Sequence, residues 1–274
     1  MPEVGKITCN ESMAAEAFSK QAPVFDKIYG PDEMIQYKRN RVRRHVFKWL
    51  PENSQILELN CGTGEDAIYF ASNGHHVHAT DLSTGMLQAL RMKIGEYDLK
   101  SRITFEQCSF TQLDQLNEFG PYDMVFSNFG GLNCTGDLHE VLQSLDPLLK
   151  PGGVVTLVVI SDFSLWETLL LFKGKWKTAM RRWFRKNGAE AKVEGQPFRC
   201  WYYSPNYVKK CLETYSLLSL EGLCTLVPPS YMENFHQKHT RMYQWLKKKE
   251  ERLKSTFPWN RIGDYFIITL QKPR

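Results

Sequence analysis

The sequence lacks the cysteine spacing that is typical of metal-binding and disulfide-rich proteins. Its seven cysteines are Cys9, Cys61, Cys108, Cys134, Cys200, Cys211 and Cys224, and no two of them form a C-x-x-C pair. Scattered thiols argue against a zinc site and against a disulfide framework. We therefore expect free thiols and no bound metal, and we interpret the histidines of His75-His76-Val77-His78 as ordinary strand residues.

Long apolar runs, repeats and low-complexity segments are also missing. No run approaches the roughly 18 apolar residues that span a bilayer, and the chain has no charged start followed by an apolar stretch. This pattern predicts a cytoplasmic protein that is neither secreted nor integral to a membrane. The 274 residues, 42% of them hydrophobic, are enough for a large core in one elaborated domain, and the net charge of +5 is modest.

The most informative stretch covers residues 56–67 and reads I-L-E-L-N-C-G-T-G-E-D-A. A short apolar run ends in two closely spaced glycines, Gly62 and Gly64, and a helical pattern follows, which predicts a strand, a tight loop and a helix start. Asp81 follows Gly62 by 19 residues at the end of the next apolar run. A carboxylate at this distance suits the two hydroxyls of a ribose, so the stretch predicts a nucleoside-binding βαβ unit.

The glycine spacing also fits the loose dinucleotide fingerprint, but the residues before it do not. The acidic Glu58 and the pair Asn60-Cys61 occupy a strand end that usually stays apolar in dinucleotide-binding proteins. With them, the stretch resembles the first motif of the class I S-adenosylmethionine-dependent methyltransferases, roughly (V/I)-L-(D/E)-x-G-x-G-x-G. It departs from that motif at Asn60, which replaces the first glycine but tolerates positive φ. The resemblance covers about residues 50–162.

The resemblance implies an α/β fold with a doubly wound, mostly parallel seven-stranded sheet. From residue 55 onward strand and helix patterns alternate, as a parallel sheet requires, and residues 217–226 and 264–271 are the expected antiparallel pair. We expect a helical N-terminal cap over residues 1–50 and a methyltransferase domain over residues 51–274. This domain is interrupted by a helical lid at about 161–203 and by a second insertion at about 228–262.

Two segments are basic. In the predicted helix over residues 31–50, six basic residues make either a solvated face or a surface for an acidic partner or an anionic membrane. In the insertion, an apolar stripe at helical spacing lies among basic residues, so this segment either covers the sheet or also rests on an anionic membrane. The first set is Lys38, Arg39, Arg41, Arg43, Arg44 and Lys48; the stripe is Leu165, Leu169, Phe172, Trp176, Met180 and Trp183, and its basic neighbours are Lys173, Lys175, Lys177, Arg181, Arg182, Arg185 and Lys186.

The resemblance also implies a set of cofactor-binding residues. Backbone around Asn60, Cys61, Gly62 and Gly64 would hold the amino-acid part of S-adenosylmethionine, and Asp81 the ribose. Leu82 and Met86 would flank the adenine, with core packing as the alternative for Met86. Ser109 and Phe110 are candidates for the base, since the loop after the third strand lacks the acid that the family usually has there. Glu58, Asn128 and Tyr29 complete the set; Tyr29 and Phe25 form either an aromatic cap or part of the core.

Few catalytic groups are needed for transfer from an activated methyl donor. If a general base acts, His139, Tyr202 and His236 are candidates, with Asp162 and His239 as further ones. The (D/N)-P-P-(Y/F) sequence of amino-group methyltransferases is absent, which argues against bases and glutamine amides as acceptors. We expect methyl transfer to a small or lipophilic acceptor, with S-adenosylhomocysteine as product. A non-catalytic S-adenosylmethionine-binding regulator and an RNA methyltransferase are the alternatives, although nucleic acid is not the expected partner; the acceptor atom and the oligomeric state stay open.

Overall fold

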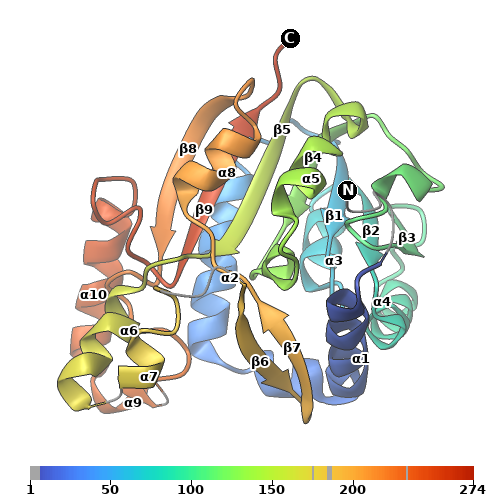
Figure 1. The fold of residues 1–274 in the computed structure, drawn as a ribbon. Coiled ribbons are helices and arrows are strands. Elements are labelled where there is room, and N and C mark those ends of the chain that lie inside the picture. The colour runs from blue at the N-terminus through green and yellow to red at the C-terminus, as the bar shows by residue number, and fades with distance from the viewer. Residues whose placement is uncertain (1–6, 175, 184–186, 233) are drawn as a thin grey trace.

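A single seven-stranded sheet forms the centre of the computed structural model, which describes residues 7–174, 176–183, 187–232 and 234–274. The strand order is β3-β2-β1-β4-β5-β9-β8 (Figure 1). Neighbours among β1 to β5 are parallel, whereas β9 is antiparallel to both β5 and β8. The strands are β1 Gln55–Leu59, β2 His76–Asp81, β3 Ile103–Gln107, β4 Tyr122–Ser127, β5 Leu149–Ile160, β8 Ser216–Leu223 and β9 Tyr265–Gln271. The predicted sheet and its antiparallel pair are confirmed.

Helices cover both faces of the sheet because its strands alternate side chains between two apolar layers. Leu57 and Leu59 belong to the layer under α5 and α8. Ile56, one position out of phase, belongs to the layer under α2, α3 and α4. The helices are α2 Glu33–Val46, α3 Glu65–Ser72, α4 Thr84–Glu96, α5 Leu138–Gln143 and α8 Pro205–Cys211. The same alternation directs Glu58 toward the α2 and α3 side.

The first helix, α1 (Cys9–Tyr29), lies beside α4 and a separate hairpin rather than on the sheet (Figure 1). The hairpin strands are β6 (Ala189–Val193) and β7 (Gln196–Cys200), paired antiparallel. The rings of Phe18 and Phe198 are 5.8 Å apart between centroids, and Gln196 donates a hydrogen bond to Glu16 over 2.7 Å. These contacts fix α1 against the hairpin.

The insertion between β5 and α8 is only partly helical, in contrast to the predicted helical lid. It contains α6 (Leu165–Leu169), a 3₁₀ turn (Leu170–Lys173) and α7 (Trp176–Ala179), followed by the hairpin. Gly174 has a φ of +70° and ends the first helical stretch, because a left-handed residue cannot continue an α-helix. Lys175, Arg185 and Lys186 lie outside the described residues, as do the side chains of Lys173 and Lys177.

The basic charges of this insertion do not all face water. Arg182 is buried and binds Glu167 and Asp264, at 2.7 and 2.5 Å between nitrogen and oxygen, while the partly exposed Arg181 also pairs with Glu167. Phe172 and Trp176 instead are 89% and 63% exposed. The amphipathic pattern is therefore reversed at these positions: aromatic rings point outward and two arginines are bound by carboxylates.

The basic face of α2 is likewise mostly internal, so its interpretation as a solvated face or a partner surface is wrong for Lys38, Arg39 and Arg41, all of which are buried. Arg41 donates to Glu250 over 3.1 Å, and Glu250 accepts four backbone N–H bonds from residues 224–227. Glu250 belongs to α10 (Thr240–Leu253), which follows the short α9 (Phe235–Lys238). The arginine of α2 thus ties α10 to the sheet. No helix within the described ranges is long and apolar enough to cross a membrane.

Candidate cofactor-binding site

The candidate site is a pocket at the carboxyl ends of β1, β2 and β4. The chain runs outward from β1 through β2 to β3 and then returns to β4 on the other side of β1. In open α/β sheets, ligands bind at such a reversal of strand order, because the loops on its two sides diverge. The lining residues come from the loops after β1 to β4 and from α1, α2, α3 and α4: Glu11, Ala14, Ala15, Phe18, Phe25, Arg39, Glu58, Asn60, Cys61, Gly62, Thr63, Glu65, Asp66, Asp81, Leu82, Met86, Phe110, Asn128, Phe129, Gly131 and Cys134.

The loop after β1 turns sharply through three left-handed residues. Asn60, Gly62 and Gly64 have φ values of +54°, +56° and +78°. A Cβ at Gly62 would meet nothing within 4 Å, so backbone there is open for a ligand, whereas a Cβ at Gly64 would lie 2.2 Å from Leu90 Cδ1. Asparagine accommodates the left-handed conformation at the motif's first position, and Gly64 serves close packing of α4 instead of lining the pocket.

Asp81 joins this loop to the one after β2. Its Oδ2 accepts from the Gly62 N–H over 2.9 Å and its Oδ1 from the Ser83 N–H over 2.8 Å. Burial raises the pKa of Asp81, and these backbone donors oppose that shift. Each oxygen keeps a further lone pair, so the carboxylate can also accept from hydroxyl groups of a ligand.

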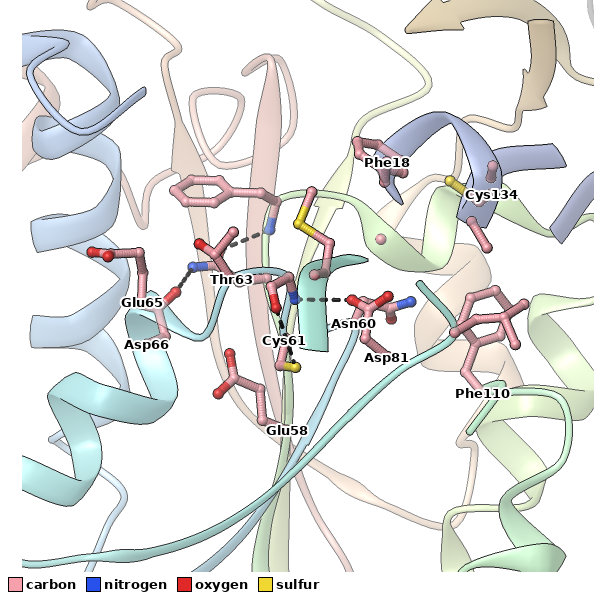
Figure 2. A pocket seen from close by; sticks show the side chains of 18 of the residues that line it. Phe18, Glu58, Asn60, Cys61, Thr63, Glu65, Asp66, Asp81, Phe110 and Cys134 are labelled. Carbon is pink, nitrogen blue, oxygen red and sulfur yellow. Dashed lines mark hydrogen bonds between the residues drawn. The ribbon is translucent and has the colours of Figure 1, made fainter. Parts of the chain in front are cut away.

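Three acidic residues, Glu58, Glu65 and Asp66, occupy one end of the pocket, and Phe110 lies at the other end (Figure 2). Asp66 is satisfied by the Arg43 Nε and the Asn128 Nδ2, both at 2.7 Å. Glu58 is 2% exposed, and its Oε2 has no hydrogen-bond partner among the described residues. Burial, reinforced by the Asp66 carboxylate, raises the pKa of Glu58 well above its ordinary value. The unpartnered oxygen can accept from a cationic group.

A buried arginine is next to this acidic end. The Arg39 Nη1 binds the Glu65 Oε2 over 2.9 Å, and its guanidinium carbon is 5.7 Å from the centroid of the Phe129 ring. The Arg39 Nε is buried and has no hydrogen-bond partner within the part of the chain that the structure describes. An unpartnered donor and an unpartnered acceptor thus line the same pocket, which suits a ligand with both an anionic and a cationic group.

Helix α1 covers the pocket and is held there by polar contacts along its length. The Ser19 and Ser83 hydroxyls are 2.7 Å apart, and Thr63 donates to the Asp26 Oδ1 over 2.6 Å. The Lys93 Nζ lies 2.7 Å from the Asp26 Oδ2. Because α1 also contributes apolar side chains, it can exclude water from a bound ligand.

Nine of the twelve predicted cofactor-binding residues line the pocket: Glu58, Asn60, Cys61, Gly62, Asp81, Leu82, Met86, Phe110 and Asn128. Three do not. Tyr29 lies one helical turn beyond Phe25 and packs against its ring, with 4.6 Å between centroids. Gly64 packs on α4. Ser109 is buried and does not line the pocket; its hydroxyl donates to the Glu11 carboxylate, which does.

The structure does not bring the candidate bases to the pocket. His139 is exposed on α5, the Tyr202 ring packs under the Arg182 guanidinium, and His236 lies 3.9 Å from Glu33. Asp162 and His239 are not lining residues either. Among the described residues, no group of three or more His, Cys, Asp or Glu side chains could hold a metal ion.

Sequence reasoning missed the contributions of Glu11, Arg39 and Asp66. Glu11 follows Thr8 by three residues, so the sequence signals a capping box, but not a side chain that lines a pocket. Arg39 stands among six basic residues that all look alike in a helical pattern. Which of them points inward depends on the packing of α2 against α3.

Comparison with known proteins agrees with this geometry. Residues 56–153 match a family described as a methyltransferase domain. A demethylmenaquinone methyltransferase of Leptospira interrogans is 26% identical over 143 residues, which cover 51% of this chain and 57% of that protein. A tRNA 5-carboxymethoxyuridine methyltransferase of Escherichia coli is 24% identical over 230 residues and 82% of each chain.

The fold is shared with solved methyltransferase structures. The 1,6-didemethyltoxoflavin-N1-methyltransferase of Burkholderia thailandensis superposes with a TM-score of 0.56 and 13% identity over 98% of this chain and 93% of that one. The chain spans about half the length of the curated relatives that it matches first, 49% and 57%. The matched residues 56–153, the motif after β1 and the seven-stranded sheet together show that the chain contains a methyltransferase domain with the fold of class I S-adenosylmethionine-dependent methyltransferases.

Proposed function

We propose that this protein binds S-adenosylmethionine and transfers its methyl group to a small, lipophilic acceptor. The observation that supports cofactor binding most directly is the pair of unpartnered buried atoms, Glu58 Oε2 and Arg39 Nε, which line one end of the pocket. An amino-acid tail has an ammonium group for the first and a carboxylate for the second. Asp81 would accept from the ribose hydroxyls, and Phe110 with Leu82 would enclose the base.

When bound, S-adenosylmethionine supplies a methyl group that is already activated by a positive sulfonium. The described lining residues include no histidine, lysine or tyrosine. The chain's contribution is therefore orientation and exclusion of water, with α1 as cover and the loop after β1 as anchor. Transfer in this pocket depends on how the acceptor is held, and not on a histidine general base.

The acceptor class is proposed from the apolar part of the lining. Ala14, Ala15, Phe18, Phe25 and Phe129 surround the space between α1 and the end of β4. Such side chains favour an apolar acceptor through the area they remove from water. Menaquinone-type acceptors, named for one relative, are an example of this class.

A direct test separates cofactor binding from catalysis. Isothermal titration should detect binding of S-adenosylmethionine and S-adenosylhomocysteine and no comparable binding of NAD. Methyl-labelled cofactor is then incubated with cell extract fractionated into lipid, small-molecule and RNA pools. Label in the lipid or small-molecule pool supports the proposal, whereas binding without label in any pool supports the non-catalytic regulator.

An RNA acceptor is the second candidate because the match to the tRNA methyltransferase extends over 82% of both chains. The burial of Lys38, Arg39 and Arg41 speaks against it, since these cations are not available to phosphates. Label in the RNA pool, together with a salt-sensitive gel shift of mixed tRNA, would favour this alternative over a lipophilic acceptor.

A further inference from the structure

Glu11, in the first turn of α1, is a buried carboxylate whose burial is not explained by helix capping. Its side chain is 3% exposed and lines the pocket. The Thr8 N–H donates to Oε2 over 2.7 Å, which completes a capping box. A capping box forms equally well on a helix surface, so the capping role does not require Glu11 to lie in the pocket wall.

The hydroxyl groups of Ser109 and Thr111 hold the Glu11 carboxylate in place. Ser109 and Thr111 donate to Oε1 over 2.9 and 3.0 Å, and Thr111 also lies 3.3 Å from Oε2. Within residues 7–174, 176–183, 187–232 and 234–274 no lysine, arginine or histidine forms an ion pair with Glu11. An ionised carboxylate has about four lone-pair positions, and three donors occupy three of them.

The surroundings restrict what the remaining position can accept. Phe110 is the residue between the two hydroxyls, and its side chain lines the same pocket together with Leu82 and Met86. Phe110 lies at the end of the pocket away from Glu58 and Asp66, with Asp81 between (Figure 2). An aromatic and aliphatic enclosure with one anionic acceptor suits a flat heteroaromatic ring that presents an amino group.

The loop that forms this end has no acid of its own. Residues 108–112 read C-S-F-T-Q, and the carboxylate that this loop binds is that of Glu11 on α1. We propose that the Glu11 carboxylate accepts a hydrogen bond from the exocyclic amino group of the cofactor's adenine. The docked α1 is then part of the site that recognises the base. This inference rests on the proposed function, because it assigns one part of the same cofactor to a residue of this chain.

The position of α1 should depend on which group the bound base presents to Glu11. A nucleoside that presents a donor to Glu11 makes this hydrogen bond only when α1 is docked, so it shifts α1 toward the docked state. A nucleoside that presents an acceptor there gains no hydrogen bond from Glu11 when α1 docks. The Glu11 side chain thus links the identity of the bound base to the docking of α1 over the pocket.

The test compares S-adenosylhomocysteine with S-inosylhomocysteine, in which a carbonyl oxygen replaces the amino group. In isothermal titration, the wild-type chain should prefer the adenosyl compound by roughly tenfold or more, since a carbonyl oxygen would face the Glu11 carboxylate without a proton between them. Glu11→Gln keeps the capping box and offers an amide that both donates and accepts. Its preference should fall to within about threefold.

The matched control is Glu16→Gln, the same change on an exposed position of the same helix, where Glu16 binds Lys20 and Gln196. This variant should retain the wild-type preference. If Glu11→Gln does not fold, Ser109→Ala replaces it, because loss of the hydroxyl frees the carboxylate to move and should also lower the preference.

Equal binding of both nucleosides by the wild type overturns the role of Glu11 and leaves the methyltransferase proposal intact. Equal weakening of both nucleosides in Glu11→Gln shows that Glu11 only holds α1, which also overturns the inference. Binding of neither nucleoside overturns the proposed function together with this inference.

Discussion

Replacing Glu58 by glutamine should make the free protein more stable and the cofactor complex weaker. The buried Glu58 Oε2 has no partner among the described residues, and the Asp66 carboxylate is close enough to raise its pKa further. Glutamine keeps the size of the side chain and removes the charge. An ionised carboxylate that is buried without a partner beside another carboxylate costs more than a neutral amide in the same place, so we expect a gain of about 1–3 kcal/mol at neutral pH.

The sign of the pH dependence follows from the raised pKa. Because the folded protein holds the Glu58 proton more tightly than the unfolded chain, stability is greatest below the ordinary glutamate pKa of 4.5 and declines as pH rises from there toward the raised folded-state pKa. The difference in stability between Glu58→Gln and the wild type should therefore grow with pH over this window. Urea unfolding of the free protein at several pH values measures it.

The same substitution should reduce the affinity for S-adenosylhomocysteine. Loss of a charge-assisted hydrogen bond to the ammonium group costs about 1–3 kcal/mol, or roughly five- to 150-fold in Kd. Glu140→Gln, at an exposed position of α5, is the control and should change neither quantity. A Glu58→Gln variant that is destabilised near pH 8 and binds the ligand like the wild type would refute the reasoning.

Three further predictions concern other parts of the molecule. Asp81→Ala should weaken binding of S-adenosylmethionine by about 1–3 kcal/mol in calorimetry, and unchanged affinity in a folded variant would remove Asp81 from the site. Arg182→Ala should lower the free energy of unfolding by about 3–5 kcal/mol, since it leaves the Glu167 carboxylate buried without this partner, yet it should not change cofactor affinity. The wild type should co-sediment with anionic but not zwitterionic vesicles at low salt, and the double variant Phe172→Ser, Trp176→Ser should not; wild-type protein that stays in the supernatant would restrict the insertion to covering the sheet.

The sheet and the loop after β1 could be predicted because their signals are local. Two glycines after an apolar run, an acid at the end of the next run and a steady alternation of strand and helix are all visible in sequence order. The positive φ of Asn60 was expected from its side chain and its position in the motif. These features depend on neighbours a few residues away, so a single sequence contains enough information.

The remaining features depend on contacts between distant segments. Arg41 is buried because Glu250, 209 positions later, is available to bind it. The aromatic residues of the insertion have helical spacing, yet Gly174 ends the helix and the following hairpin packs on α1 instead. A spacing pattern states which residues could share a face, but it does not state which partner that face meets.

The position of β9 has a consequence for how the chain reaches its native state. β9 follows β8 in chain order, yet it lies between β5 and β8, with seven residue pairs aligned against β5. Until β9 has left the ribosome, β5 exposes one edge and β8 has no neighbour, which is the arrangement that favours association with other chains. Truncation before Tyr265 should therefore produce aggregation in the cell, even though every residue that lines the pocket is still present.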